Sequence, residues 1–308
     1  MKITRDIAYR KHLLDSQRSR MGVGERREGI HVSDLVMCVR KSWAERIAKH
    51  IPTISDETIL TWLRGLSHEA LLTDGIDQVR SGYCFACQHN WPWTPEIADS
   101  GAICPTCGET LLTGTIDWVF LEETEKTDEG DEFVIDDYVP VEMKSTLKSS
   151  RKSFEDGDML WFVDQIKSYM FMHNKESGRV AVLHVMGDYS RQDMNLRSEG
   201  PKADLRVYRV EWESEREKEN WGTELQISKA VVEDPTDMPS LNLRSPRHNM
   251  ICEYCVIGEK LPNGQPCELF PWTPEGTRRG SALAKKYTMD EIESELGAFG
   301  VESESTSE

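Results

Sequence analysis

The sequence lacks any long apolar run. No stretch of its 308 residues approaches the roughly 18 consecutive apolar residues of a membrane-spanning helix. The first residues, M-K-I-T-R-D-I-A-Y-R-K, also lack the apolar core of a secretory signal peptide. We therefore expect a cytoplasmic protein without a membrane partner.

An excess of positive charge is also missing. The 37 Lys and Arg residues are outnumbered by 54 Asp and Glu residues, and the formal net charge is −17. Because affinity for the phosphate backbone depends on Lys and Arg, this balance argues against a protein that coats nucleic acid. Basic residues gather in the first fifty residues and in 144–152, whereas acidic residues gather in 122–137 and after 290. This distribution suits a polynucleotide that passes one local site, although solvated charged faces would produce it equally well.

What remains is the composition of a soluble globular protein. Hydrophobic residues make up 38% of the chain and charged residues 30%. A chain of this length holds one large domain or a core domain with an insertion.

Two apolar, β-branched runs between residues 111 and 144 each deliver a carboxylate. The first, L-L-T-G-T-I-D-W-V-F-L, contains Asp117, and the second, F-V-I-D-D-Y-V-P-V-E-M-K, contains Glu142 and Lys144. Because strand side chains alternate, Glu142 and Lys144 project from one face of a sheet, and a hairpin brings Asp117 beside them. Two carboxylates and an ammonium can form a Mg²⁺ or Mn²⁺ site for phosphodiester hydrolysis. A solvated strand edge is the alternative interpretation of E-x-K.

The eight cysteines are grouped. Cys84, Cys87, Cys104 and Cys107 form two C-x2-C pairs whose separation is typical of a four-cysteine zinc site, rather than of unligated thiols. This zinc ribbon is expected to be an insertion that needs its metal to fold. Its role is either structural or, through the tryptophans of W-P-W, contact with bases or with a partner protein.

The remaining pattern predicts alternating helices and strands. Helices are expected over residues 33–50, after Ser55, over 158–173 and over 214–232, and strands over 178–187 and 205–212. The first helix would bury Leu35, Val39, Trp43 and Ile47, and the second would turn Ile59, Leu63, Leu66 and Ala70 inward. His68 in the second helix is, taken alone, more often a packed or surface histidine than a ligand. Gln165 and Tyr169 are four residues apart and therefore share one helix face.

The order of these features is more informative than any single one. It comprises a helical His68, Asp117 in G-T-I-D, Glu142 and Lys144 in E-M-K, and Gln165 and Tyr169 in Q-I-K-S-Y. In this order residues 31–268 resemble the PD-(D/E)XK nuclease superfamily, and within it the RecB-like exonucleases that include CRISPR-associated iron–sulfur exonucleases and related phage enzymes. The resemblance implies an α/β fold with a restriction-endonuclease-like core, whose central mixed sheet is flanked by helices.

The resemblance also implies roles for these residues. His68, Asp117, Glu142 and the backbone carbonyl of Met143 would bind Mg²⁺ or Mn²⁺, and an imidazole ligand favours Mn²⁺. Lys144 would assist the attacking water. Gln165 and Tyr169 would position the scissile strand and the lysine.

The other cysteines fit the same resemblance. Cys38, Cys252, Cys255 and Cys267 remain after the ribbon is subtracted, and in the iron–sulfur nucleases such an arrangement holds a 4Fe-4S cluster that joins the two ends of the domain. Four thiolates also suit a second zinc ion. Two features depart from the family: the gap from Cys255 to Cys267 is long, and a zinc ribbon between His68 and Asp117 is not general.

The predicted function is a divalent-metal-dependent DNA exonuclease of recombination, repair or processing, acting on single strands or duplex ends. The alternatives are a DNA-end-binding adaptor with a nuclease fold and a structure-specific endonuclease. A homo-oligomer, and a replication or recombination partner bound by the ribbon or the acidic tail, are compatible with this function. The predicted regions are a basic, partly ordered arm (1–30), a helical part (31–80), the zinc ribbon (81–110), the nuclease core (111–232), the iron–sulfur region (233–272) and an acidic, partly disordered tail (273–308).

Overall fold

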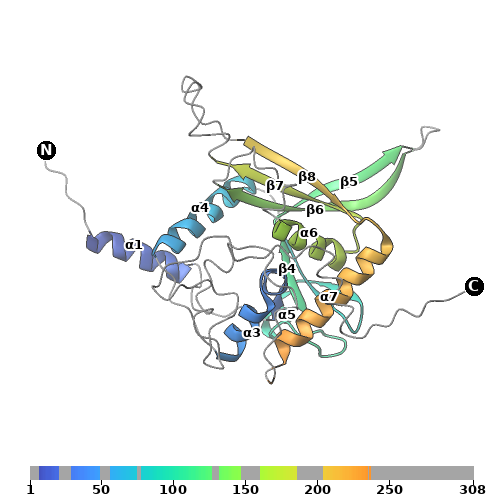
Figure 1. Cartoon of the computed structure of the whole chain (residues 1–308), viewed down its shortest axis with the longest axis horizontal. Helices are drawn as coiled ribbons and strands as arrows, with labels where there is room; N and C mark the ends of the chain where they lie inside the picture. The colour runs from blue at the N-terminus through green and yellow to red at the C-terminus, as the bar shows by residue number, and fades with distance from the viewer. Residues whose placement is uncertain are drawn as a thin grey trace, which may run out of the picture.

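The computed structural model describes residues 7–20, 29–48, 56–74, 78–126, 132–146, 160–185, 204–234 and 236. Within them, helices and two mixed β-sheets alternate, which confirms an α/β protein (Figure 1). No helix in this part of the chain is both long and apolar enough to span a membrane.

One sheet has the strand order β1-β4-β2-β3. Its strands are β1 (Ile30–His31), β2 (Val79–Cys84), β3 (His89–Pro92) and β4 (Leu112–Ile116). β1 runs parallel to β4, and the other pairs are antiparallel. The short helix α5 (Pro95–Asp99) follows β3, with Thr94 as its N-cap.

The second sheet has the order β5-β6-β7-β8. Its strands are β5 (Trp118–Lys126), β6 (Glu132–Thr146), β7 (Ser177–His184) and β8 (Asp204–Glu211). β5 and β6 form the predicted antiparallel hairpin, and β6 runs parallel to β7. A parallel pair needs a crossover, which here contains helix α6 (Leu160–Met172).

The main core lies where α6 meets both sheets and helix α7 (Glu215–Glu233) (Figure 1). Ile166, Tyr169 and Met170 of α6 are each at most 1% exposed and pack in one cluster with Val180 of β7 and Leu225 of α7. Both helices lie where the sequence predicts them, because their apolar residues recur at helical spacing.

The predicted helix over 33–50 is interrupted. Helix α2 (Val32–Val36) and helix α3 (Val39–Ala48) are separate, with the break at Met37 and Cys38. The first helix also begins earlier than expected, because the Asp34 carboxylate accepts a hydrogen bond from the backbone N–H of His31 at 2.9 Å and so acts in the first turn rather than as the N-cap.

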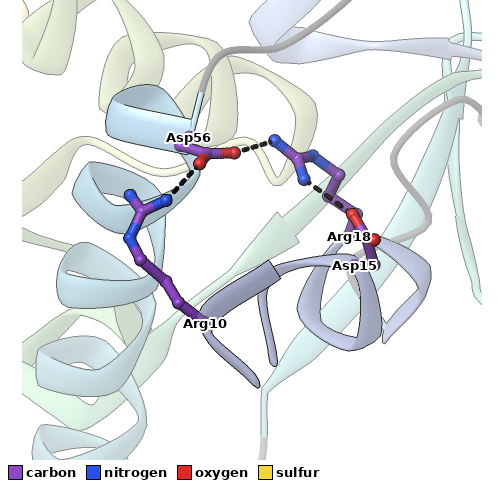
Figure 2. Close-up of polar contacts among 4 residues, drawn as sticks. All are labelled: Arg10, Asp15, Arg18 and Asp56. Carbon is purple, nitrogen blue, oxygen red and sulfur yellow. Dashed lines mark hydrogen bonds and ion pairs between the residues drawn. The ribbon is translucent and has the colours of Figure 1, made fainter. Parts of the chain in front are cut away.

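Part of the predicted N-terminal arm is helical. Helix α1 (Ile7–Arg20) packs against the start of α4 (Asp56–Leu72) through polar contacts (Figure 2). Arg10 and Arg18 each contact a different oxygen of Asp56 at 2.6 Å. The aspartate thus joins α1 to the first turn of α4, where a negative charge also suits the helix dipole.

The inward stripe predicted for α4 is wrong in part. Ile59 is fully buried, but Leu66 is 47% exposed and Ala70 is also exposed. The face of α4 that meets β6 instead carries His68, Glu69 and Leu72, so polar residues define the side of this helix that matters for the site.

Candidate functional site

Asp117 lies where the chain passes from one sheet to the other. Ile116 is the last residue of β4 paired with β2, and Trp118 is the first residue of β5 paired with β6. The backbone bends at the aspartate between these two ladders. Its Oδ2 accepts a hydrogen bond from the backbone N–H of Met143 at 2.9 Å, which holds the carboxylate against β6.

Glu142 and Lys144 form a close ion pair on β6. The Lys144 Nζ donates to Glu142 Oε1, as the alternation of a strand predicts for residues two apart. Glu142 is 1% exposed, and its other oxygen, Oε2, is buried and has no hydrogen-bond partner among the described residues. One carboxylate oxygen is therefore satisfied by the ammonium, whereas the second is not satisfied by any described residue.

Burial controls the electrostatics of these three groups. It raises the pKa of Glu142 to about 8 and also raises the pKa of Asp117, although Lys144 opposes both effects. Burial lowers the pKa of Lys144, but the charges of Glu142 and Asp117 outweigh it, so that this pKa is raised. The site thus keeps its amine charged, while burial disfavours ionisation of its carboxylates.

Gln165 and Tyr169 meet on α6, as their spacing predicts. Gln165 Nε2 donates to the Tyr169 hydroxyl at 3.0 Å, and both side chains are buried. Burial, and then the charge of Glu142, raises the pKa of Tyr169 well above its ordinary value. The tyrosine ring lies close against β4, because a Cβ atom at Gly114 would stand 2.7 Å from Tyr169 Cε1. Only glycine at this position lets the ring approach the site.

A pocket of about 110 Å³ lies between α4 and β6. Its lining comprises Gly65, His68, Glu69, Leu72, Met143, Lys144 and Ser145. The four α4 residues have the spacing i, i+3, i+4, i+7, which places them on one helix face. His68 Nδ1 is buried, and no residue in the described segments forms a hydrogen bond with it. The predicted ligand His68 therefore lies in the same pocket as Lys144.

Glu69 and two aromatic residues belong to this region without having been predicted. Burial and the charge of Asp117 raise the pKa of Glu69. The rings of Trp161 and Phe162, at the start of α6, lie with their centroids 5.7 and 5.8 Å from Lys144 Nζ. Cation–π attraction at these distances helps to fix the ammonium. No local pattern in the sequence distinguishes Glu69 from the other charged residues of this helix.

The four ribbon cysteines converge. The sulfur atoms of Cys84, Cys87, Cys104 and Cys107 all lie within 4.8 Å of one another. The distance is 3.4 Å from Cys84 to Cys107 and 3.9 Å from Cys87 to Cys104. Zn–S bonds of about 2.3 Å in a tetrahedral site place sulfurs about 3.8 Å apart. The four cysteines can therefore hold a metal ion, and within the described residues they are the only preformed group of this kind.

The two cysteine turns share a backbone geometry. The residue after each second cysteine, Gln88 or Gly108, has positive φ, of 49° and 80° respectively. Such a residue turns the chain sharply so that both sulfurs of a pair face inward. Without a cation, the hydrogen bond to Cys107 and then burial raise the pKa of Cys87 to about 12. Four thiols this close do not all ionise unless a metal compensates their charge.

The tryptophans of this cysteine module, defined as residues 79–112, pack within it. Trp91 and Trp93 contact the cluster of Cys84, Ile97, Cys104 and Leu111. The Arg80 guanidinium carbon lies 3.8 Å from the centroid of the Trp93 ring. Both rings thus contribute to the small core that surrounds the sulfurs.

His173, just after α6, connects the module to the second sheet. Its Nε2 lies 2.9 Å from Ser81 Oγ of β2, and its Nδ1 lies 3.0 Å from Asn90 Nδ2 of β3 and 2.5 Å from the Tyr138 hydroxyl of β6. Burial lowers the pKa of His173 to about 4. The neutral imidazole thus joins three strands and the helix that carries Gln165 and Tyr169.

Of the four predicted iron–sulfur ligands, only Cys38 lies among the described residues. Cys38 is half-buried in the break between α2 and α3, where the backbone N–H of Lys41 lies 3.4 Å from its sulfur. Cys252, Cys255 and Cys267 lie outside the described residues, so the cluster stays a prediction.

Comparisons with known proteins assign no family to this chain. No family model matches it, and no curated protein matches it. Among solved structures, the crystal structure of SSO0001 has 15% identity and a TM-score of 0.43, covering 83% of this chain and 97% of that chain. Scheffersomyces stipitis Rai1, in complex with (3'-NADP)+ and calcium ion, has 10% identity and a TM-score of 0.18, covering 86% of this chain and 69% of that one. At these TM-scores neither likeness bears on the fold or the activity of this chain.

Proposed function

We propose that this protein is a divalent-metal-dependent DNA exonuclease with a PD-(D/E)XK-type core. The observation that carries the proposal is the Glu142 carboxylate, which is buried beside Asp117 with one oxygen on Lys144 and the other unpartnered. A buried carboxylate oxygen without a partner is costly unless a ligand satisfies it.

The chemical types of the candidate ligands support Mg²⁺ or Mn²⁺, although among the described residues only the four cysteines bring their ligand atoms within 4.8 Å of one another. Glu142 Oε2 and His68 Nδ1 are both buried and have no hydrogen-bond partner in the described part of the chain, and Asp117 offers a second carboxylate held against β6. Oxygen donors suit Mg²⁺, and the imidazole also suits Mn²⁺. A bound ion would supply Lewis-acid activation of water and screen the phosphate oxygens.

The chain's own groups supply the remaining chemistry. Lys144, held between Glu142 and the rings of Trp161 and Phe162, keeps its charge and can orient a water molecule or stabilise negative charge that develops on the phosphate. Gln165 and Tyr169 hold each other beside the carboxylates and position the lysine and the strand.

The four-cysteine module is proposed to hold Zn²⁺ as a structural element. Cys38, Cys252, Cys255 and Cys267 are proposed to bind a 4Fe-4S cluster. Iron and sulfide analysis of anaerobically purified protein, with an absorbance band near about 400 nm, would distinguish this cluster from a second zinc ion.

A gel assay tests the nuclease proposal. End-labelled single-stranded and duplex DNA are incubated with Mn²⁺, Mg²⁺ or a chelator, beside circular DNA that an exonuclease leaves intact. We expect cation-dependent shortening of linear DNA, which Lys144→Ala reduces by about 10²–10³-fold because charge stabilisation at the phosphate is lost. Lys11→Ala, which removes an exposed ammonium from α1, serves as the matched control.

Two results contradict the proposal. Cleavage by folded, zinc-loaded Lys144→Ala at the wild-type rate would remove the assigned role of the lysine. Tight binding of DNA ends without cleavage in any cation would instead favour an end-binding protein, and cutting of circles would favour an endonuclease.

A further inference from the structure

The cysteine module is continuous with the strand that leads to Asp117. Leu111, the residue before β4, is fully buried in the cluster that contains Cys84 and Cys104. The five residues of β4 follow it, and Asp117 comes next. At about 3.3 Å per residue, about 20 Å of extended chain joins Leu111 to Asp117. A single short strand therefore begins beside the sulfurs and ends at the carboxylates.

The module end of this strand is held from several sides. The backbone N–H of Leu111 donates to the Ala102 carbonyl at 2.8 Å. The Leu111 side chain lies close against β2, because a Cβ atom at Gly82 would stand 2.8 Å from Leu111 Cδ1. β2 ends at Cys84 and pairs with β4 along the whole length of β4. The position of Leu111 thus follows the arrangement of the segments that carry the cysteines.

The arrangement around Leu111 depends on what holds the four sulfurs together. The sulfurs lie within 4.8 Å of one another, and Leu111 packs with Cys84, Ile97 and Cys104 in the small core of the module. So small a core buries little apolar surface, so a metal ion on the sulfurs should fix it and loss of the ion should loosen it. Loosening would release the strand that begins at Leu111.

The other end of β4 is joined to β6 by a weak link. The β5–β6 ladder ends at the pair of Trp118 and Val141, and Asp117 lies between that ladder and the β2–β4 ladder. Its carboxylate reaches β6 through the hydrogen bond that the Met143 N–H donates to Oδ2 at 2.9 Å. A displacement of β4 by about 1 Å is enough to lose such a bond.

We propose that the cysteine module positions Asp117, and that Leu111 is the positioning residue through which it acts. With a metal ion on the four sulfurs, β4 keeps the Asp117 carboxylate on Met143. Without the ion, the carboxylate leaves Met143 while the main core stays folded. This inference rests on the proposed function for the zinc ion and for the importance of Asp117, but its consequence is structural and can be measured without DNA.

The experiment measures amide hydrogen exchange by NMR in full-length protein labelled with ¹⁵N-methionine, without added Mg²⁺ or Mn²⁺. The chain has 12 methionines, and the variants Met143→Leu and Met170→Leu identify the two signals of interest. Met143 reports the contact with Asp117, and Met170, fully buried in the main core, is the internal reference. Zinc-loaded protein is compared with protein stripped by a chelator, and metal analysis determines the zinc content of both.

We expect the Met143 amide to exchange about fivefold faster after zinc removal, the equivalent of one ordinary hydrogen bond, and Met170 to be unchanged. Added zinc should restore the slow exchange. Asp117→Ala removes the acceptor, so it should speed Met143 exchange in the loaded protein and abolish the response to zinc.

Three results would overturn the inference. The first is equal Met143 exchange with and without zinc. The second is an equal acceleration at Met170, because the metal would then support the whole fold rather than Asp117. The third is a wild-type protein that binds no zinc.

Leu111→Ala tests the route through β4. In loaded protein it should speed Met143 exchange relative to Met170, whereas Leu111→Met should keep most of the protection. Leu225→Ala is the matched control, because it removes the same side chain from an equally buried position on α7. It should lower global stability and leave the ratio of the two exchange rates as in wild type. The same change of ratio in both alanine variants would reject Leu111 as the positioning residue.

A cleavage assay separates this inference from the nuclease proposal. A zinc response at Met143 in a protein that cleaves no DNA would sustain the positioning of Asp117 and reject the exonuclease. Cleavage by wild type without a zinc response at Met143 would do the reverse. In an active protein, we expect Leu111→Ala to lower the rate at saturating Mn²⁺, and Leu111→Met to restore it.

Discussion

The cysteine module and the carboxylate site, which comprises Asp117, Glu142 and Lys144, compensate buried charge in opposite ways. The module brings four sulfurs within 4.8 Å of one another, so four thiolates there would repel one another. The carboxylate site already contains a counter-charge, since Lys144 bonds to Glu142. We therefore expect the first region to need a metal ion in order to fold, whereas the second region should fold without one.

The largest expected effect is the loss of one ribbon cysteine. Cys84→Ser removes a fully buried sulfur, so we expect the variant not to retain the zinc ion proposed for this module. The binding free energy at stake is on the order of 10 kcal/mol for a structural four-ligand site. Metal analysis of the purified protein, with hydrogen exchange over residues 79–112, measures the outcome.

Cys38→Ser is the matched control for this change. Cys38 lies in the α2–α3 break and is not among the clustered sulfurs, so its replacement should leave zinc content unchanged. A full equivalent of tightly bound zinc in Cys84→Ser would show that the cysteine module does not need all four sulfurs to hold its metal, contrary to the comparison drawn above.

The second effect concerns the ion pair of the carboxylate site. Lys144→Met leaves the carboxylates of Glu142 and Asp117 without their ammonium, and we expect a loss of about 3 kcal/mol in the free energy of unfolding. Combining it with Glu142→Leu removes the uncompensated charge, so the double variant should regain most of the loss. Urea unfolding of zinc-loaded protein without added Mg²⁺ or Mn²⁺ measures both.

Lys41→Met provides the comparison for an ordinary ion pair. Lys41 and Glu45 are each about one-third exposed, at 33% and 32%, and their loss should cost about 0.5 kcal/mol or less. If Lys144→Met destabilised the protein no more than Lys41→Met, the carboxylate site would not depend on its internal counter-charge.

The cysteine module could be predicted from the sequence because its geometry is local. Two C-x2-C turns carry both the ligand identity and the approximate spacing, and the residues after them, Gln88 and Gly108, only refine the turn. The hairpin that joins Asp117 to Glu142 was likewise predictable, since period-two alternation places Glu142 and Lys144 on one face.

Other features depend on packing that no local pattern specifies. Leu66 fits an apolar stripe on α4, yet it is exposed because the polar side of the helix faces β6. The break at Met37 separates two helices that share one apolar periodicity. The sequence does not distinguish Glu69 from other charged residues of a surface helix, and only the structure places it in the lining of the pocket. The need for glycine at position 114 follows only from the Tyr169 ring that packs against it.

The smallest expected effect is on the pH dependence of stability. It involves His173 and tests whether the cysteine module and the carboxylate sheet unfold together. Its pKa is lowered from 6.5 to about 4 because the ring is buried among Ser81, Asn90 and Tyr138. The unfolded chain therefore binds a proton that the folded chain does not, so stability is complete above pH 6.5 and falls as the pH drops toward 4.

For His173 alone the loss between about pH 7.5 and about pH 5 is about 2 kcal/mol. His173→Gln cannot titrate and should lose less stability than wild type over this interval, while His89→Gln, at an exposed position of β3, should behave as wild type. Comparing each variant's own pH dependence removes the contribution of the four module cysteines, which all three proteins share. Because the imidazole bonds both to β2 and β3 of the module and to β6 of the carboxylate sheet, its protonation should increase hydrogen exchange on both sides of the junction. Increased exchange in the module alone would mean that the two regions unfold separately, and that His173 packs between them without coupling them.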